Sequence, residues 1–186
     1  MKKNICVFGG SVSGKNKENK KIAKIIGKII VESNFNIVFG GGEKGIMGAI
    51  AQSGIQNGGS TLGIIPSFLF KKDVLDSAHS KKFNTRLIKT ETMHERKKLM
   101  YDKSDGFLVL PGGIGTLDEC FEVLTWCQLN LIKNKNVGII NFSGYWDPLV
   151  NLLSHVIKEE FMGPNNLNYF EEIKDLKKLK FFLKNI

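Results

Sequence analysis

Short apolar segments alternate with helix-patterned segments along nearly the whole chain, and this alternation restricts the fold more than any other feature. Strands are predicted at residues 4–8, 36–39, 60–66, 85–89, 106–111 and 137–142. Helices are predicted at residues 17–33, after 45 through Ile55, and at 92–104, 116–130, 148–161 and 173–184. Strand–helix alternation with uniformly apolar strands indicates an α/β fold, with a doubly wound parallel sheet covered by helices on both faces.

The size and composition indicate one globular domain spanning residues 1–186. The chain is 42% hydrophobic and 24% charged, which is an ordinary balance for a globular domain. Its three cysteines are too few for a disulfide framework and are typical of a reducing compartment. No apolar run approaches the ~20 residues of a membrane span, and the N-terminal apolar stretch is too short for a signal peptide. We therefore expect a cytoplasmic protein without membrane association.

The chain is basic, with a net charge of +9 carried almost entirely by lysine. Arg86 and Arg96 are its two arginines. A basic surface attracts anions, including nucleic acids, but the sequence contains no zinc finger or other nucleic-acid-binding motif. We therefore expect a small anionic ligand and no nucleic-acid partner.

Three predicted strands end in glycine clusters, at residues 9–14, 40–45 and 112–115. Ligands of open parallel sheets bind beyond the carboxyl ends of the strands, where helix N-termini favour anions. Glycine also lets a ligand approach the backbone N–H groups closely. The first two clusters supply these candidates for phosphate-binding loops: Gly9, Gly10, Ser11, Gly41 and Gly42.

The first two clusters imitate known nucleotide motifs without completing them. "GGSVSGKN" has P-loop spacing, but Asn16 stands where a magnesium-binding Ser or Thr is needed. "GGGEKG" matches the dinucleotide fingerprint, but no acidic residue follows about 20 positions later to hold a ribose hydroxyl. A phosphate-binding turn remains a candidate, a nicotinamide cofactor is not expected, and tight helix–strand packing is an alternative explanation of these glycines.

The third cluster belongs to the segment "PGGIGTLDE", residues 111–119, which has two interpretations. Thr116 and Glu119 have the spacing of a capping box, and Asp118 would complement the helix dipole. However, one glycine suffices for a turn, and Arg96 in "MHERKK" is expected near the same end of the sheet. Arginine binds two phosphate oxygens with its planar fork, although a surface ion pair with Glu91 or Asp102 would also explain it. The scattered histidines and cysteines predict no metal site.

With "MHERK" and "PGGIGTLDE" both complete, the sequence resembles the Lonely Guy family of cytokinin riboside 5′-monophosphate phosphoribohydrolases, long mislabelled as lysine decarboxylases. The resemblance covers about residues 4–162, including "CVFGGSVSG", "FGGGEKGIMGA" and "GYWDPL". It implies a Rossmann-like fold and usually a homodimer. No cofactor is expected. The implied reaction is hydrolysis of the N-glycosidic bond of an adenosine 5′-monophosphate, with or without an N6 substituent, to free base and ribose 5-phosphate.

The resemblance also implies roles for individual residues. Arg96 and Glu119 would be the catalytic pair. The remaining substrate contacts would be Asp73, Lys97, Gly112, Gly113, Ile114, Gly115, Thr116 and Thr125. Asp73 stands where relatives commonly have a glutamate that contacts the base.

Three other functions remain as alternatives. The fold could hold a nucleotide or cofactor without turnover, as in molybdenum-cofactor carriers, or act as a general AMP nucleosidase. Amino-acid decarboxylation would need a lysine placed to form a Schiff base with pyridoxal phosphate, and no lysine has a supporting context.

Overall fold

The computed structural model describes residues 2–69, 85–132, 135–162 and 170–186. Its strands are β1 (Lys3–Phe8), β2 (Phe35–Phe39), β3 (Thr61–Pro66), β4 (Thr85–Thr90), β5 (Gly106–Val109), β6 (Asn136–Ile140) and β7 (Phe170–Ile173). Its helices are α1 (Glu18–Glu32), α2 (Gly45–Gln56), α4 (Met93–Asp102), α5 (Ile114–Gln128), α6 (Asp147–Lys158) and α7 (Leu176–Lys184). The predicted α/β class is confirmed.

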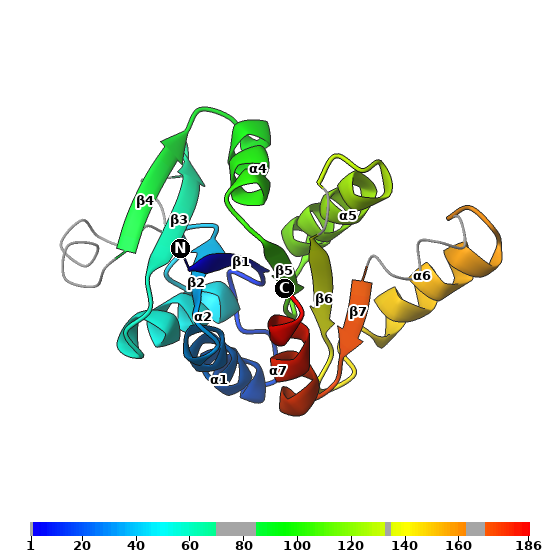
Figure 1. The fold of residues 1–186 in the computed structure, drawn as a ribbon, viewed down its shortest axis with the longest axis horizontal. Coiled ribbons are helices and arrows are strands. Elements are labelled where there is room, and N and C mark those ends of the chain that lie inside the picture. The colour runs from blue at the N-terminus through cyan, green and yellow to red at the C-terminus, as the bar shows by residue number, and fades with distance from the viewer. Residues whose placement is uncertain (1, 70–84, 133–134, 163–169) are drawn as a thin grey trace.

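All strand pairs in the seven-stranded sheet are parallel, in the order β4-β3-β2-β1-β5-β6-β7. The chain winds outward from β1 to β4 and then returns to the other side of β1 to continue through β5, β6 and β7 (Figure 1). The strand order therefore reverses between β1 and β5. In doubly wound sheets the ligand crevice lies at this reversal, beyond the carboxyl ends of the two strands.

Two apolar cores lie on opposite faces of the sheet, because successive side chains of a strand point to opposite sides. In β1, Ile5 and Val7 face a core built with α1, α2 and α7. Cys6 and Phe8 face the other core, built with α4, α5 and α6. Figure 1 shows α1, α2 and α7 on one side of the sheet and α4 and α5 on the other. The site-bearing helices α4 and α5 are thus anchored through one shared core.

The C-terminal region differs from the sequence prediction. A helix was predicted from residue 173, but the chain forms β7 as an edge strand over Phe170–Ile173 before α7 begins at Leu176. In β7 only Ile173 is buried, so the segment lacks the continuous apolar run of the inner strands. Asp175 caps α7 by accepting a hydrogen bond from the Lys178 backbone N–H, which explains why the helix starts later.

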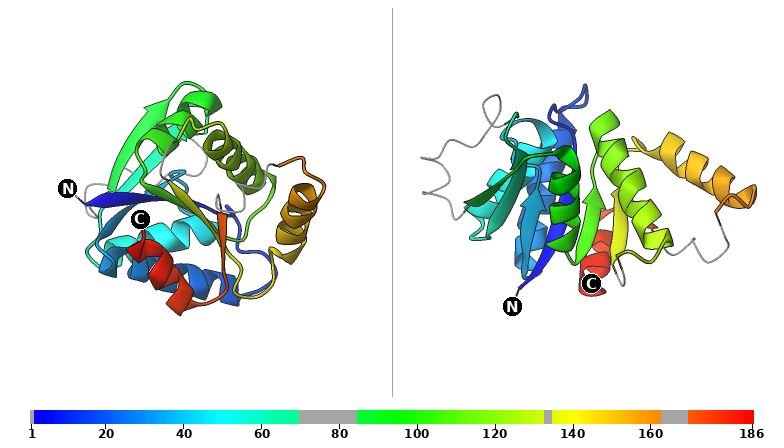
Figure 2. Two further views of the ribbon diagram at one scale, coloured as in Figure 1. Left: turned by 45° about the vertical axis from the view of Figure 1, so that its right-hand side comes forward. Right: turned by 90° about the horizontal axis from the view of Figure 1, so that it is seen from above.

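Helix α6 extends away from the β7 side of the sheet (Figure 2). Only Leu149 and Leu153 of this helix are buried. Among the described residues, no helix combines the length and apolarity needed to cross a bilayer.

Candidate active site

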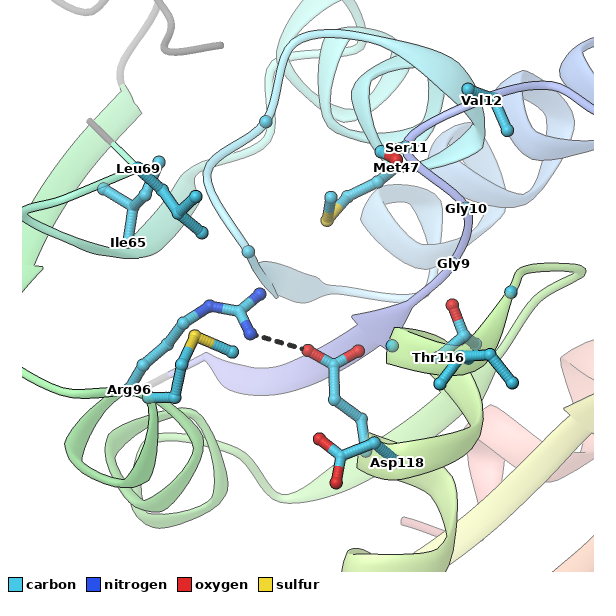
Figure 3. A pocket seen from close by; sticks show the side chains of 17 residues that line it. Gly9, Gly10, Ser11, Val12, Met47, Ile65, Leu69, Arg96, Thr116 and Asp118 are labelled. Carbon is cyan, nitrogen blue, oxygen red and sulfur yellow. Dashed lines mark hydrogen bonds and ion pairs between the residues drawn. The ribbon is translucent and has the colours of Figure 1, made fainter. Parts of the chain in front are cut away.

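A cavity of about 530 Å³ opens at the reversal of strand order, within the size range of small-molecule sites. It is lined by residues that follow β1 and β2, the end of β3, and the first turns of α4 and α5 (Figure 3). The lining residues that the sequence had singled out are Gly9, Gly10, Ser11, Gly40, Gly42, Arg96, Gly113, Ile114, Gly115, Thr116, Asp118 and Glu119. Segments far apart in the chain therefore meet at the expected edge of the sheet.

The loop after β1 is bonded to two neighbouring elements through Gly10. The Gly10 backbone N–H donates to the Pro111 carbonyl at 3.0 Å, which ties this loop to the one after β5. The Gly10 carbonyl accepts from the N–H groups of Ile46 and Met47 at 2.9 and 3.3 Å. These are first-turn amides of α2, so these two N–H groups are already bonded to protein rather than free for an anion.

Glycines of the second cluster are explained by close packing. Gly45 has φ of +67°, and a Cβ there would run into the Ser11 backbone. Gly41 has φ of +79° and faces Ile65. A Cβ on Gly40 would overlap the Arg96 guanidinium, so this glycine makes room for the arginine. The packing alternative therefore accounts for these three positions.

The N-terminus of α5 is different, because two of its glycines have no packing reason. A Cβ on Gly112 would overlap Thr116, but a Cβ on Gly113 or Gly115 would meet nothing within 4 Å. Neither of these two has a positive φ. The first N–H groups of a helix have no intrahelical acceptor, and here no side chain caps them. This bare backbone faces the cavity and can bind an anion.

Arg96 and Glu119 form a buried ion pair across the floor of the cavity. Arg96 Nη1 donates to Glu119 Oε1 at 2.9 Å, and both side chains are only 10% exposed. Arg96 Nε also donates to the Ile64 carbonyl of β3 at 3.1 Å, which fixes the plane of the guanidinium. Figure 3 shows Arg96 reaching from α4 toward α5, with the ion pair drawn as a dashed line.

The capping-box interpretation of Thr116 and Glu119 is wrong. Helix α5 begins at Ile114 with Gly113 as its N-cap, two residues before the predicted start. Thr116 therefore lies inside the first turn, and Glu119 is turned inward to Arg96. The alternative ion pair of Arg96 with Glu91 or Asp102 is also wrong, since its carboxylate partner is Glu119.

A genuine capping box of the same Thr-x-x-Glu pattern starts α4. Thr92 Oγ1 accepts from the Glu95 N–H at 3.1 Å, and Glu95 Oε2 accepts from the Thr92 N–H at 3.3 Å. It sets where α4 begins and hence where Arg96 lies on the helix. Of the two Thr-x-x-Glu patterns, one builds a helix end and the other delivers a carboxylate to the cavity.

Burial raises the pKa of Glu119 above its ordinary value, even though the neighbouring Arg96 lowers it. Asp118 adds to the rise through its negative charge, while Lys97 opposes it. A carboxyl with a raised pKa in a cavity beside a cation is a frequent property of catalytic groups.

Lys97 lies outside the cavity lining and is engaged by protein carboxylates. Its Nζ bonds Asp118 at 3.0 Å and Glu122 at 2.8 Å, and its side chain is 9% exposed. Burial lowers its pKa, but the bonds to Glu122 and Asp118 outweigh this, so the pKa is raised. Tyr101 donates its hydroxyl to the same Glu122 at 2.6 Å.

Four other predicted contacts do not line the cavity or are not described. Thr125 is exposed and donates to the Phe121 carbonyl within α5. Gly41 packs against Ile65 and Gly112 against Thr116, and neither glycine lines the cavity. Asp73 lies outside the described residues.

Sequence reasoning missed the apolar wall of the cavity. Val12, Met47, Ile65, Leu69 and Met93 line it. Figure 3 shows Ile65 and Leu69 across the cavity from Thr116. Met93 is the first residue of the quoted "MHERK", and Met47 follows the glycine cluster at residues 40–45, so these positions were the available signals. Ile65 belongs to strand β3 and carried no signal of this kind. Apolar side chains of this kind suit a planar heterocycle.

Among the described residues, no group of three or more His, Cys, Asp or Glu side chains could hold a metal ion. The site's chemistry as described rests on the arginine, the carboxylate and backbone N–H groups.

The strand order, the crevice and the free helix N-terminus define a Rossmann-like α/β protein with a ligand site at the topological switch point. The model of a family described as "Possible lysine decarboxylase" matches residues 47–180. The chain belongs to this family, and its curated relatives include proteins named cytokinin riboside 5′-monophosphate phosphoribohydrolases, or Lonely Guy proteins.

Two plant relatives illustrate the similarity. The probable phosphoribohydrolase LOGL6 of Oryza sativa subsp. japonica is 37% identical over 161 residues, which are 87% of this chain and 62% of that protein. The phosphoribohydrolase LOG5 of Arabidopsis thaliana is 37% identical over 177 residues, which are 95% of this chain and 75% of that protein. The chain thus spans somewhat less than two thirds of the rice relative's length.

Solved structures share the fold at lower identity. The molybdenum cofactor binding protein from Rippkaea orientalis superposes with a TM-score of 0.71 at 22% identity, over 99% of this chain and 96% of that one. The molybdenum cofactor carrier protein MCP from Chlamydomonas reinhardtii gives 0.68 at 18% identity, over 99% and 97%. At these identities the likeness shows the fold alone.

Proposed function

We propose that this protein hydrolyses the N-glycosidic bond of adenosine 5′-monophosphates, including N6-substituted ones, and releases the free base and ribose 5-phosphate. The buried Arg96–Glu119 pair at the cavity floor carries this proposal. Burying two charges is unfavourable unless each is paired, and hydrophobic replacements would often be as stable. A buried ion pair that borders a ligand-sized cavity is therefore better explained by catalysis than by stability alone.

The cavity has a separate environment for each part of such a substrate. The phosphate is placed at the N-terminus of α5, where Gly113 and Gly115 leave the backbone bare. The base is placed against the apolar wall formed by residues such as Met47, Ile65 and Leu69. The ribose then lies between them, beside the Arg96–Glu119 pair. A charged phosphate contact contributes about 1.5–3 kcal/mol, so AMP is expected to react far better than adenosine.

The reaction breaks the C1′–N9 bond; the hydroxyl of a water molecule ends on C1′ and the proton of that water ends on the departing base. The bond electrons leave with the base, and positive charge develops on the sugar in an oxocarbenium-like transition state. The Glu119 carboxylate stabilises this charge or orients and deprotonates the attacking water. Arg96 holds one oxygen of Glu119, which leaves the second oxygen for the substrate or water.

The proposal extends to a cytoplasmic homodimer. Several large apolar side chains on or next to α5 and α6 are exposed: Leu129 at 61%, Leu131 at 63%, Leu152 at 50% and Phe161 at 84%. Large exposed apolar side chains on these two helices and the residues that follow them support an interface with a second copy. All three cysteines are free and buried, as suits a reducing cytoplasm.

Chromatography of reaction products from AMP, N6-isopentenyl-AMP, adenosine and free lysine tests the function. We expect free base and ribose 5-phosphate in equal amounts from both nucleotides, slow or no cleavage of adenosine, and no decarboxylation of lysine. Faster turnover of AMP than of N6-isopentenyl-AMP would favour a general AMP nucleosidase. Tight binding of AMP without any cleavage would instead support a non-catalytic binding protein.

A further inference from the structure

Tyr145, in the turn between β6 and α6, bonds the glycine loop from outside the cavity. Its hydroxyl donates to the Gly112 carbonyl at 2.6 Å, across 33 residues of sequence. Tyr145 does not line the cavity, and none of the roles proposed above involves it. This hydrogen bond acts on the peptide unit that joins Gly112 to Gly113.

The geometry of that peptide unit links Tyr145 to the cavity. A trans peptide is planar, so the Gly112 carbonyl and the Gly113 N–H point in opposite directions. Glycine on both sides leaves the unit conformationally free to turn over. A donor that holds the carbonyl on one side therefore fixes the N–H on the other side. The preceding peptide is held in the same way, because the Gly10 N–H donates to the Pro111 carbonyl at 3.0 Å.

The turn that carries Tyr145 is itself rigidly held. Buried Asn141 accepts from the Trp146 backbone N–H at 2.8 Å and donates to Asp147 at 2.7 Å and to Glu172 at 2.6 Å. Trp146 is only 5% exposed, and its ring packs edge-on against the Tyr145 ring, with 4.7 Å between the ring centroids. The phenol is thus presented from a fixed support rather than from a free loop.

We infer that Tyr145 is a positioning residue that orients the Gly113 N–H toward the substrate phosphate. The inference rests on the proposed function for the identity of the ligand. It assigns to the "GYWDPL" segment the role of a fixed support for the phosphate loop. Because the phosphate keeps its position through the reaction, losing this support weakens substrate and transition-state binding alike, which raises KM and leaves kcat nearly unchanged.

Tyr145→Phe tests the inference, since it removes the hydroxyl and keeps the ring that packs on Trp146. We expect KM for AMP and the dissociation constant of ribose 5-phosphate to rise about 3- to 10-fold, as for loss of one hydrogen bond, with kcat within about twofold of wild type. Cleavage or binding of adenosine, which lacks the phosphate, should be unchanged. A merely structural role would instead lower the melting temperature and weaken AMP and adenosine equally.

Ser53→Ala is the matched control, because it also deletes a hydroxyl that donates to a backbone carbonyl, that of Lys24, but between α1 and α2. It should leave KM and ribose 5-phosphate binding unchanged. Calorimetric titration with ribose 5-phosphate separates the two proposals. If wild-type protein binds ribose 5-phosphate without cleaving AMP, the proposed function is contradicted. The affinities of wild type and Tyr145→Phe for ribose 5-phosphate still test the role of Tyr145 in that case. Unchanged affinity in Tyr145→Phe, or no binding to wild type, overturns the inference.

Discussion

At the scale of single residues, the site depends on which side chains and which bare backbone groups reach the cavity. The Thr-x-x-Glu pattern occurs twice, and only the local start of the helix decides whether the glutamate caps it or faces the ligand. In α5 the helix begins at Ile114, so Glu119 is free to pair with Arg96. The sequence alone left both outcomes open, because the exact ends of helices are the least certain part of a structure prediction from sequence.

The raised pKa of Glu119 gives activity and stability opposite dependences on pH. If the carboxylate is the active form, kcat/KM falls as pH drops through a pKa above the ordinary value near 4.5. Because the pKa of Glu119 is higher in the folded than in the unfolded protein, the protonated carboxyl stabilises the fold at low pH. This stabilisation is lost as the pH rises through the folded-state pKa. A pH–rate profile, and melting curves of wild type against Glu119→Gln, measure both trends.

Asp118→Asn provides the matching control for this profile. The Asp118 charge helps to raise the pKa of Glu119, so its removal should move the acidic limb to lower pH. A limb that stays in place, or an activity that rises as pH falls below it, would contradict the assignment of Glu119 as the ionised group.

Gly115 should behave as a functional rather than a structural glycine. A Cβ there meets nothing within 4 Å, and alanine is the better helix former by about 0.5–1 kcal/mol. Gly115→Ala is therefore expected to keep or raise the melting temperature while weakening AMP binding. Gly112→Ala should destabilise the fold, since its Cβ would overlap Thr116. Unimpaired AMP binding in Gly115→Ala would mean that the ligand does not approach this backbone.

At the scale of elements, α4 and α5 are joined by two adjacent ion-pair systems. Arg96 and Glu119 form one, and Lys97 with Asp118 and Glu122 forms the other. Arg96 and Lys97 are neighbours on α4, and Asp118 and Glu119 are neighbours on α5. The ion pairs of Lys97 therefore hold the two helices at the distance that the Arg96–Glu119 pair requires. The family resemblance implied a substrate contact for Lys97, whereas its observed partners suit a positioning role.

Lys97→Met separates these two roles. Leaving Glu122 and Asp118 without their cation should lower stability by about 1–3 kcal/mol, less than for a fully buried pair because Asp118 is half exposed. It should also reduce kcat more than it raises KM. Lys98→Met, which breaks an exposed pair with Asp102, should change stability by less than about 0.5 kcal/mol. A large rise in KM for AMP with an unchanged melting temperature would show that Lys97 contacts the substrate.

The elements themselves were largely predictable because their patterns are strong. Inner strands buried on both faces read as continuous apolar runs, and most helices show regular apolar spacing. β7 was missed because an edge strand with the sequence Phe-Glu-Glu-Ile buries little. The apolar cavity wall was missed because its members come from separate loops and helices, which only the tertiary structure brings together.

At the scale of the whole molecule, the position of the site follows from topology. The strand order reverses beside β1, and the three glycine-rich strand ends expected to meet there do so. The sequence predicted this region but could not predict which glycines serve packing and which serve the ligand. That distinction depends on what each missing Cβ would touch.

The proposed dimer predicts a particle mass of about twice 20.8 kDa in light scattering. Phe161→Asp, next to α6, should dissociate it, because the side chain is 84% exposed and would place a charge in the interface. Phe181→Asp is the control, since Phe181 is also exposed but lies on α7. A monomeric wild type, or a dimer insensitive to Phe161→Asp, would contradict this arrangement.

The comparison of binding with turnover in Glu119→Gln tests the central claim most directly. Glutamine keeps the size of the side chain and can still accept a hydrogen bond from Arg96, but it carries no negative charge. We predict a folded protein that binds AMP with nearly wild-type affinity and releases adenine and ribose 5-phosphate at least about 10²-fold more slowly. Near-normal kcat in this variant would contradict the account, because the buried pair would then not be the catalytic centre.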